Sequence, residues 1–251
     1  MVNIVHINKD HIPELQRSVS CIGYFDGMHR GHQKLIRTAV KKAQEKGLTA
    51  SLICFSPDPE EVISSKRAVH LFSDAERYKI ASSFGIRQIL IIRFDKEFMD
   101  LSPSSFIKDY LEKMNIEELI CGFDFSFGKY GKGDPSFLKE NSSFSVDIIE
   151  EEQYKGSKIS SSRIKECILK GDFSLAEKLL GFPYYFTLEV IQSTQNKRKC
   201  LTSCKNIDDR CIVPQDGIYS DRLEVRDGIF YLHERQMHSP DEQIRLECDE
   251  L

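Results

Sequence analysis

Short apolar runs alternate with amphipathic segments along the first two-thirds of the chain. The apolar runs predict buried strands at residues 19–25, 49–55, 88–92, 119–122 and 145–149. The segments between and after them predict helices at residues 31–46, 74–84, 103–114, 161–170 and 174–180. This alternation predicts a parallel sheet covered by helices on both faces, the α/β class. Such sheets bind ligands at the carboxyl ends of their strands, where the strand order reverses.

The pattern changes near Gly181-Phe182-Pro183. Residues 186–191 alternate between apolar and polar, residues 216–219 read as a turn, and runs at 223–225 and 229–232 flank a turn at Asp227-Gly228. We therefore predict a first domain at residues 1–183 and a small antiparallel β domain at residues 184–251. The polar residues 240–251 are expected to fray.

Composition narrows the class of protein. The 251 residues are 40% hydrophobic and 29% charged, and the net charge of −4 argues against a broad nucleic-acid or anionic-membrane surface. No apolar run approaches the ~18–20 residues of a membrane span. The N-terminal residues lack the basic start and apolar stretch of a signal peptide. We expect a cytoplasmic protein.

Eight cysteines do not predict a disulfide scaffold in a chain of this length and kind. Three lie in apolar strand segments and are expected to be buried thiols: Cys21, Cys54 and Cys121. Three others lie upstream of two histidines: Cys200, Cys204 and Cys211, with His233 and His238. Because no CxxC pair is present, we do not predict a metal site built by the protein.

Residues 21–33 read CIGYFDGMHRGHQ, where a predicted strand becomes a helix. Glycines let backbone amides approach a ligand, and a helix N-terminus attracts anions. His29 and His32 would lie at that positive end, where imidazoles can donate to phosphate oxygens. The sequence has no GxxxxGK[ST] phosphate loop. The alternative, equally open for an isolated HxGH, is a structural turn with one histidine capping the helix.

Two further segments support a ligand site. Residues 121–133 read CGFDFSFGKYGKG, in which glycines and phenylalanines surround Asp124, a carboxylate expected to be buried. This loop either packs on its own Phe123, Phe125 and Phe127 or offers flat apolar faces to an aromatic ligand. Residues 158–165 read KISSSRIK, and three hydroxyls followed by basic side chains at a helix start predict a second anion site.

HxGH at the first strand-to-helix turn, with SSSRIK at a late helix start, resembles the nucleotidyltransferase superfamily. GYFDGMHRGHQ, FSPDP at residues 55–59, and the segments at residues 121–133 and 158–184 make the resemblance more specific. From about residue 18 to residue 184 the chain is similar to the adenylyltransferase half of the bacterial bifunctional riboflavin kinase/FAD synthetases. The resemblance implies a Rossmann-like nucleotidyltransferase domain that joins AMP from ATP to FMN, with Mg²⁺ bridging the phosphates. It implies small-molecule substrates, and neither nucleic acid nor a membrane as partner.

The resemblance also implies roles for individual residues. His29 and His32 would bind ATP phosphates and stabilise the leaving pyrophosphate. The ATP side would include Gly23, Phe25, Asp26, Gly27, Gly31, Ser160, Ser161, Ser162 and Lys165. The flavin side would include Asp124, Phe125, Phe127 and Gly128.

Three positions depart from the family pattern. Tyr24 replaces an Asn, Asp58 replaces a His, and Lys165 replaces an Arg. Lys keeps the positive charge but loses the bidentate fork of Arg. Asp58 would repel phosphate unless it faces a metal or points away. We expect these changes to affect rate and affinity rather than the type of reaction.

The C-terminal segment resembles the family's flavin kinase domain only weakly. That domain has a Gly-Phe-Pro-Thr-Ala-Asn segment, and its best counterpart is residues 201–206, where Asn206 is retained and Cys204 replaces the Thr that holds the metal. Residues 214–219 resemble the strand that follows. Three downstream glutamates, Glu234, Glu242 and Glu247, do not lie in a segment like the family's catalytic strand. We predict a shortened, degenerate module without riboflavin kinase activity.

Two alternative functions remain open at the level of sequence. One is a flavin- or nucleotide-binding regulator without catalysis, which Asp58 and Lys165 favour and the retained histidines disfavour. The other is a nucleotidyltransferase for a different phosphate substrate, such as pantetheine or nicotinamide phosphate, which the FDFSFG loop disfavours.

Overall fold

The computed structural model describes residues 2–185, 187–196, 199–206, 208–220, 223–226, 229–233 and 244–245. The chain forms two compact units. The first comprises Met1–Ala68 and Asp74–Lys158, and the second comprises Val69–Ser73 and Ile159–Leu251. The predicted boundary at residues 183/184 falls inside the second unit and stays a prediction.

The first unit contains a six-stranded sheet with the order β1-β4-β3-β2-β5-β6 and parallel pairing throughout. Its strands are β1 (Asn3–Ile7), β2 (Ser18–Ile22), β3 (Thr49–Ser56), β4 (Gln88–Arg93), β5 (Ile116–Gly122) and β6 (Ser145–Ile149). Since β3 follows β2 on one side and β5 pairs with β2 on the other, the strand order reverses between β2 and β5. The carboxyl ends of these two strands are therefore the expected ligand edge.

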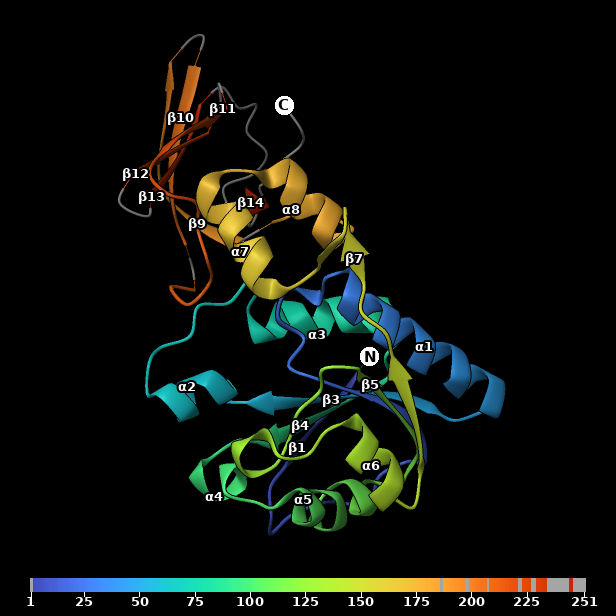
Figure 1. Cartoon of the computed structure of the whole chain (residues 1–251). Coiled ribbons are helices and arrows are strands. Elements are labelled where there is room, and N and C mark those ends of the chain that lie inside the picture. Colours follow the sequence, from blue (N-terminus) through green and yellow to red (C-terminus); the bar gives the residue numbers. More distant parts are fainter. Residues whose placement is uncertain are drawn as a thin grey trace. The chain divides into compact units, whose positions relative to one another are not determined.

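Helices cover both faces of this sheet. The helices of this unit are α1 (Arg30–Lys46), α2 (Pro59–Ser64), α3 (Asp74–Ser83), α4 (Lys96–Met99), α5 (Pro103–Asp109) and α6 (Pro135–Asn141). Figure 1 shows α1 and α3 on one face and α5 and α6 on the other. Short 3-10 turns are η1 (Asp26–Met28), η2 (Leu111–Met114) and η3 (Lys129–Gly131). A hairpin of β7 (Gln153–Tyr154) and β8 (Ser157–Lys158) completes the unit.

The sequence predicted this α/β architecture correctly, and α1 buries the apolar face expected of it. The three expected thiols are buried and free: Cys21, Cys54 and Cys121. Three boundaries were wrong. The strand predicted at residues 119–122 begins at Ile116. The first predicted strand stops at Ile22 because Phe25 adopts a left-handed backbone, and the helix predicted at 103–114 breaks at Tyr110 into α5 and η2. β1 and the short helices α2, α4 and α6 were not predicted.

The second unit combines two helices with an antiparallel sheet. The helices are α7 (Ser161–Lys170) and α8 (Phe173–Leu180). The sheet has the order β11-β12-β13-β10-β9-β14. Its strands are β9 (Thr187–Asn196), β10 (Lys199–Asn206), β11 (Gly217–Ser220), β12 (Leu223–Arg226), β13 (Ile229–His233) and β14 (Ile244–Arg245). The buried Tyr184 hydroxyl donates to the carbonyls of Leu71 (3.3 Å) and Ile212 (3.0 Å) within this unit.

The antiparallel sheet confirms the predicted β class of the C-terminal segment. The turn predicted at residues 216–219 was wrong, because Gly217–Ser220 forms β11. The predicted turn at Asp227-Gly228 and most of the tail at 240–251 lie outside the described residues. Within the described part, none of the helices has the length and apolar character that crossing a membrane requires.

Candidate active site

The turn after β2 has an unusual backbone. Gly23 N–H donates to the Ile53 carbonyl (3.1 Å), which ties the turn to β3. Phe25 then has φ of 60° although it carries a side chain, and its ring is 1% exposed. Gly27 follows at φ of 80°, and Asp26 is buried beside it. A bulky residue held in the left-handed region is strained, and such strain persists where the surrounding structure enforces it.

His29 ends this turn and begins α1. Its Nδ1 accepts a hydrogen bond from the backbone N–H of His32 at 3.4 Å, so the imidazole is the N-cap of the helix. An accepting Nδ1 places the proton of a neutral ring on Nε2. A Cβ on Gly31 would lie 3.2 Å from Cε1 of His29, so a glycine there leaves room for the ring. The capping alternative is thus correct for His29, and it leaves the second ring nitrogen available.

His29 and His32 form one stacked pair. Their ring centroids are 3.7 Å apart with planes 17° from parallel, and the Phe25 ring lies 5.2 Å from His32. Burial lowers the pKa of His29 to about 4, with Asp26 opposing the shift. Burial, then the charges of His29 and Arg77, lower the pKa of His32 well below its usual value. Both rings are therefore neutral near pH 7 and supply hydrogen bonds rather than charge.

The loop after β5 brings Asp124 to the same edge of the sheet. Its carboxylate forms an ion pair with Lys158 of β8, and Lys158 Nζ lies 5.2 Å from the Phe123 ring centroid. Lys158 lowers the pKa of His29 and Asp124 raises it, so both charges act on His29. The expectation of a buried Asp124 was wrong, because its side chain is 51% exposed.

The other residues of this loop have different environments. Phe127 is buried in the core, with ring centroids 5.4 Å from Phe106 and 6.4 Å from Phe137. Phe125 stacks on Phe127 at 5.5 Å and remains half-buried. A Cβ on Gly128 would lie 2.7 Å from the backbone nitrogen of Pro103. The packing alternative therefore describes Phe127 and Gly128, while Asp124 and Phe125 are more accessible.

Two of the departures from the family pattern contact each other. The Tyr24 side chain hydrogen-bonds the Asp58 carboxylate, which joins the loops after β2 and β3. Asp58 Oδ1 also accepts from the backbone N–H of Glu60 at 2.7 Å and caps α2. These two contacts direct the carboxylate oxygens to protein donors, and the negative charge of Asp58 remains.

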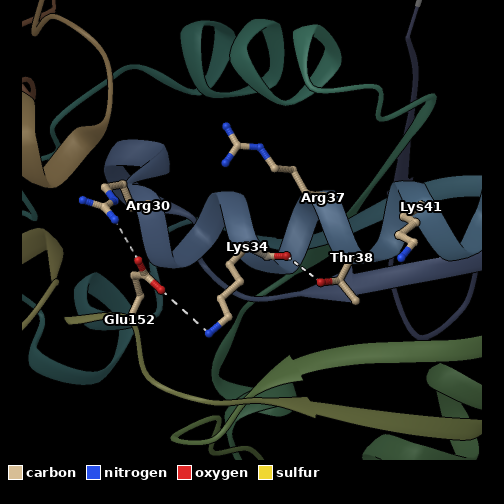
Figure 2. Close-up of a pocket in the computed structure, with 6 residues that line it drawn as sticks. All are labelled: Arg30, Lys34, Arg37, Thr38, Lys41 and Glu152. Carbon is tan, nitrogen blue, oxygen red and sulfur yellow. Dashed lines mark hydrogen bonds and ion pairs between the residues drawn. The ribbon is translucent and has the colours of Figure 1, made fainter. Parts of the chain in front are cut away.

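A basic cavity runs along the exposed flank of α1 from the residue after His29. Its volume is about 330 Å³, and its lining residues are Arg30, Lys34, Arg37, Thr38, Lys41 and Glu152. Figure 2 shows Arg30 and Lys34 pointing toward Glu152, which lies 3.0 and 3.7 Å from them in two ion pairs. Four cations and one carboxylate give this flank a positive balance next to the helix N-terminus.

The serine motif lies in the second unit. Ser160 is the N-cap of α7, and its Oγ accepts from the backbone N–H of Arg163 at 3.3 Å. Ser161 and Ser162 are the first two residues of α7, and Lys165 follows one turn later. One hydroxyl thus serves the helix as a plain cap would, and the others lie in its first turn.

The site has no cluster of metal ligands among the described residues. Within the described ranges, no group of three or more His, Cys, Asp or Glu could hold a metal ion. The side chains of Cys200, Cys204 and His233, and all of His238, lie outside what the structure describes.

Sequence reasoning missed Arg77 and Glu152 near the histidine turn. Arg77 lies on the buried face of α3 with Ile80 and Ala81, so a charge on an apolar helix face was the available signal.

Comparisons with known proteins identify the family of the chain. A model of the FAD synthetase family matches residues 11–163. The bifunctional riboflavin kinase/FMN adenylyltransferase of Bacillus subtilis is 34% identical over 90% of this chain and 74% of its own length. That of Buchnera aphidicola is 37% identical over 82% of this chain and 68% of its own length. A crystal structure from Streptococcus pneumoniae, described as a macrolide-efflux protein, has a TM-score of 0.83 at 26% identity, over 95% of this chain and 86% of that one. The family match and these identities show that the chain belongs to the FAD synthetase family.

Proposed function

We propose that the chain is an FMN adenylyltransferase, which transfers AMP from ATP to FMN and releases pyrophosphate. The observation that carries this proposal is the pair His29–His32, stacked at the N-terminus of α1 and at the point where the strand order reverses, with the His29 side chain buried. A helix N-terminus attracts phosphate groups, and the Asp124 loop follows the neighbouring strand β5. Membership of the FAD synthetase family supports this assignment.

The reaction is a single displacement at phosphorus. A phosphate oxygen of FMN attacks the α-phosphorus of ATP, the bond to the bridging oxygen breaks, and pyrophosphate leaves with that electron pair. The attacking phosphate is already ionised near neutral pH, so no strong general base is required. The protein must hold two polyanions together in line and stabilise the charge on the leaving group.

The two histidines suit the leaving-group side because they are neutral donors. With Nδ1 of His29 committed to the helix cap, its Nε2–H is free to donate to a phosphate oxygen. His32 Nδ1 is buried without a hydrogen-bond partner, and an unpaired buried polar atom costs about 1–3 kcal/mol unless a ligand satisfies it. Removing one preorganised donor of this kind typically lowers kcat about 100–1000-fold.

Positive charge for the phosphates comes from side chains near the histidines. Lys158 acts electrostatically on His29, and Arg30 begins the basic flank of α1. We assign Gly23, Phe25, Asp26, Gly27 and Gly31 to the ATP side as the turn that shapes it. By resemblance, Ser160, Ser161, Ser162 and Lys165 contact nucleotide phosphates, and this assignment stays a prediction.

Magnesium enters this proposal as the MgATP substrate. Mg²⁺ prefers hard oxygen ligands and usually keeps several waters when phosphates bind it. The ion supplies charge neutralisation on the phosphates, and the residues of the chain supply position and hydrogen bonds.

The flavin side is assigned to the loop after β5. Asp124 and Phe125 would contact FMN directly, because both retain exposed surface. Phe127 and Gly128 would fix the conformation of the loop without contacting FMN, because Phe127 is buried and Gly128 closely approaches Pro103. We further propose that residues 184–251 do not phosphorylate riboflavin, and that the protein acts in the cytoplasm on small molecules.

Incubation with ATP, Mg²⁺ and FMN tests the proposal. Oxidised and reduced FMN should be compared in parallel, with FAD separated by chromatography. FAD accumulating over many turnovers with either form supports the assignment. Tight binding of FMN and ATP without FAD in either case would instead support the non-catalytic regulator.

A further inference from the structure

Arg77 is a buried arginine that reaches from α3 to the histidine turn. Its side chain is only 3% exposed. Nη1 donates to the Tyr24 carbonyl at 2.7 Å, and the guanidinium carbon lies 4.6 Å from the centroid of the Tyr24 ring. Nη2 pairs with Asp74 on the same helix. One guanidinium therefore fixes the backbone and the ring of the residue that directly precedes the strained Phe25.

The burial of Arg77 is costly and only partly compensated. A buried charge requires both an ion pair and hydrogen bonds for its donors. Arg77 has Asp74 and the Tyr24 carbonyl, but its Nε has no hydrogen-bond partner. Among the described residues, two buried side-chain polar atoms lack a partner, and the other is Nδ1 of His32. Both belong to groups that interact electrostatically at this turn.

We propose that Arg77 is a positioning residue for adenylyl transfer, which holds the Tyr24–Met28 turn and thereby sets the orientation of His29 and His32. The turn needs such a clamp because Phe25 and Met28 have φ of 60° and 47°, values that side-chain-bearing residues rarely adopt. The clamp acts through Tyr24, whose side chain also hydrogen-bonds Asp58 of the loop after β3. Arg77 thus connects α3 to both loops that border the histidines.

Arg77 also contributes a fixed positive charge next to His32. After burial, the groups that lower the pKa of His32 are His29, which repels the imidazolium only when it is itself protonated, and the permanently charged Arg77. Around His29, Asp26 and Asp124 raise the pKa while Lys158 lowers it. Removing the Arg77 charge removes a repulsion toward the imidazolium, so the pKa of His32 should rise, with burial still holding it below its usual value.

The inference rests on the proposed function, and its test has one readout that does not require catalysis. Arg77→Met removes both the charge and the hydrogen-bond donors, whereas Arg77→Lys keeps the charge and loses the planar pair of guanidinium donors. Lys79→Met, an exposed position on the same helix, is the matched control. The His32 pKa is measured by NMR titration of the imidazole resonances, and kcat and KM are measured from FAD formation.

Arg77→Met should raise the His32 pKa relative to the parent protein, because the repulsion between Arg77 and the imidazolium is removed. Arg77→Lys should leave that pKa unchanged but lower kcat at least about tenfold with smaller changes in KM, because the turn loses its clamp. Lys79→Met should change neither quantity.

Two results would overturn the inference, and a third would separate it from the proposed function. If Arg77→Lys turns over at the parental rate, the pair of guanidinium donors does not position the histidines, whether or not Arg77→Met folds. If folded Arg77→Met leaves the His32 pKa unchanged, Arg77 does not act on His32. If the pKa behaves as expected while the parent protein makes no FAD, the proposed function fails but the electrostatic role of Arg77 stands.

Discussion

Substitution of His29 separates its role in the helix cap from its role in catalysis. His29→Ala removes both the cap acceptor Nδ1 and the N–H at Nε2. His29→Asn retains a short side chain with an oxygen acceptor, which is among the best N-caps, but has no group in place of Nε2–H. The two variants should therefore differ in stability while losing the same catalytic donor.

The structure sets the size of both effects. Loss of an N-cap acceptor costs about 1 kcal/mol, and the 3.4 Å bond between His32 N and His29 Nδ1 is long, which places it at or below that value. For a chain of this size, 1 kcal/mol corresponds to about 2–4 °C in Tm. Loss of a preorganised phosphate donor costs about 3–4 kcal/mol in the transition state, or roughly 100–1000-fold in kcat.

Thermal unfolding and steady-state FAD formation measure the two effects on the same samples. His29→Ala should unfold a few degrees below His29→Asn, and both should lose at least about tenfold in kcat. Asp95→Ala, which removes the N-cap of α4, is the control that should lower Tm without lowering kcat. Turnover within a few-fold of the parent in both His29 variants would refute the catalytic role. Restored turnover in His29→Asn alone would assign His29 to the cap.

Three further predictions concern the flavin loop, acid stability and the second unit. Asp124→Ala should weaken FMN binding more than ATP binding in calorimetry, while Asp100→Ala, which breaks another exposed ion pair, should change neither; equal losses for both ligands would contradict the flavin assignment. Burial lowers the pKa of His29 to about 4, so the unfolded state binds more protons than the folded state between that pH and about 6.5. The free energy of unfolding should therefore fall by up to about 1.4 kcal/mol per pH unit as the pH drops through this range. A denaturant midpoint that stays constant over this range would contradict the prediction. Purified protein with riboflavin, ATP and Mg²⁺ or Zn²⁺ should form no FMN, and FMN accumulating over many turnovers would make the enzyme bifunctional.

The regular part of the fold could be predicted because its signals are local. The helix α1 carries an apolar stripe and ends at Gly47 in the left-handed conformation, and the strands β2 to β6 are short apolar runs. The exact end of β2 could not be predicted. Phe25 is apolar and continues the run, but its backbone is set by tertiary contacts of the turn, which leave no trace in periodicity.

The residues of the candidate site could be predicted where a short sequence motif contains them. The contacts that those residues make in the folded chain could not be predicted. His29 and His32 were identified from HxGH and indeed form one stacked pair. Asp124 is exposed and forms an ion pair with Lys158, which lies 34 residues away in the sequence. Arg77 is separated from Tyr24 by 53 residues, so its contact with the turn was equally invisible. Long-range partners of charged residues are the part that a single sequence does not supply.

The most direct test of the account follows the phosphorus atoms of ATP. In parallel reactions with FMN and Mg²⁺, ATP is labelled at the α-phosphate or at the γ-phosphate. Adenylyl transfer predicts that the α-label appears in FAD and the γ-label in pyrophosphate, in equal amounts. Label from the γ-position in a flavin product, or no FAD from either oxidised or reduced FMN, would contradict the central claim.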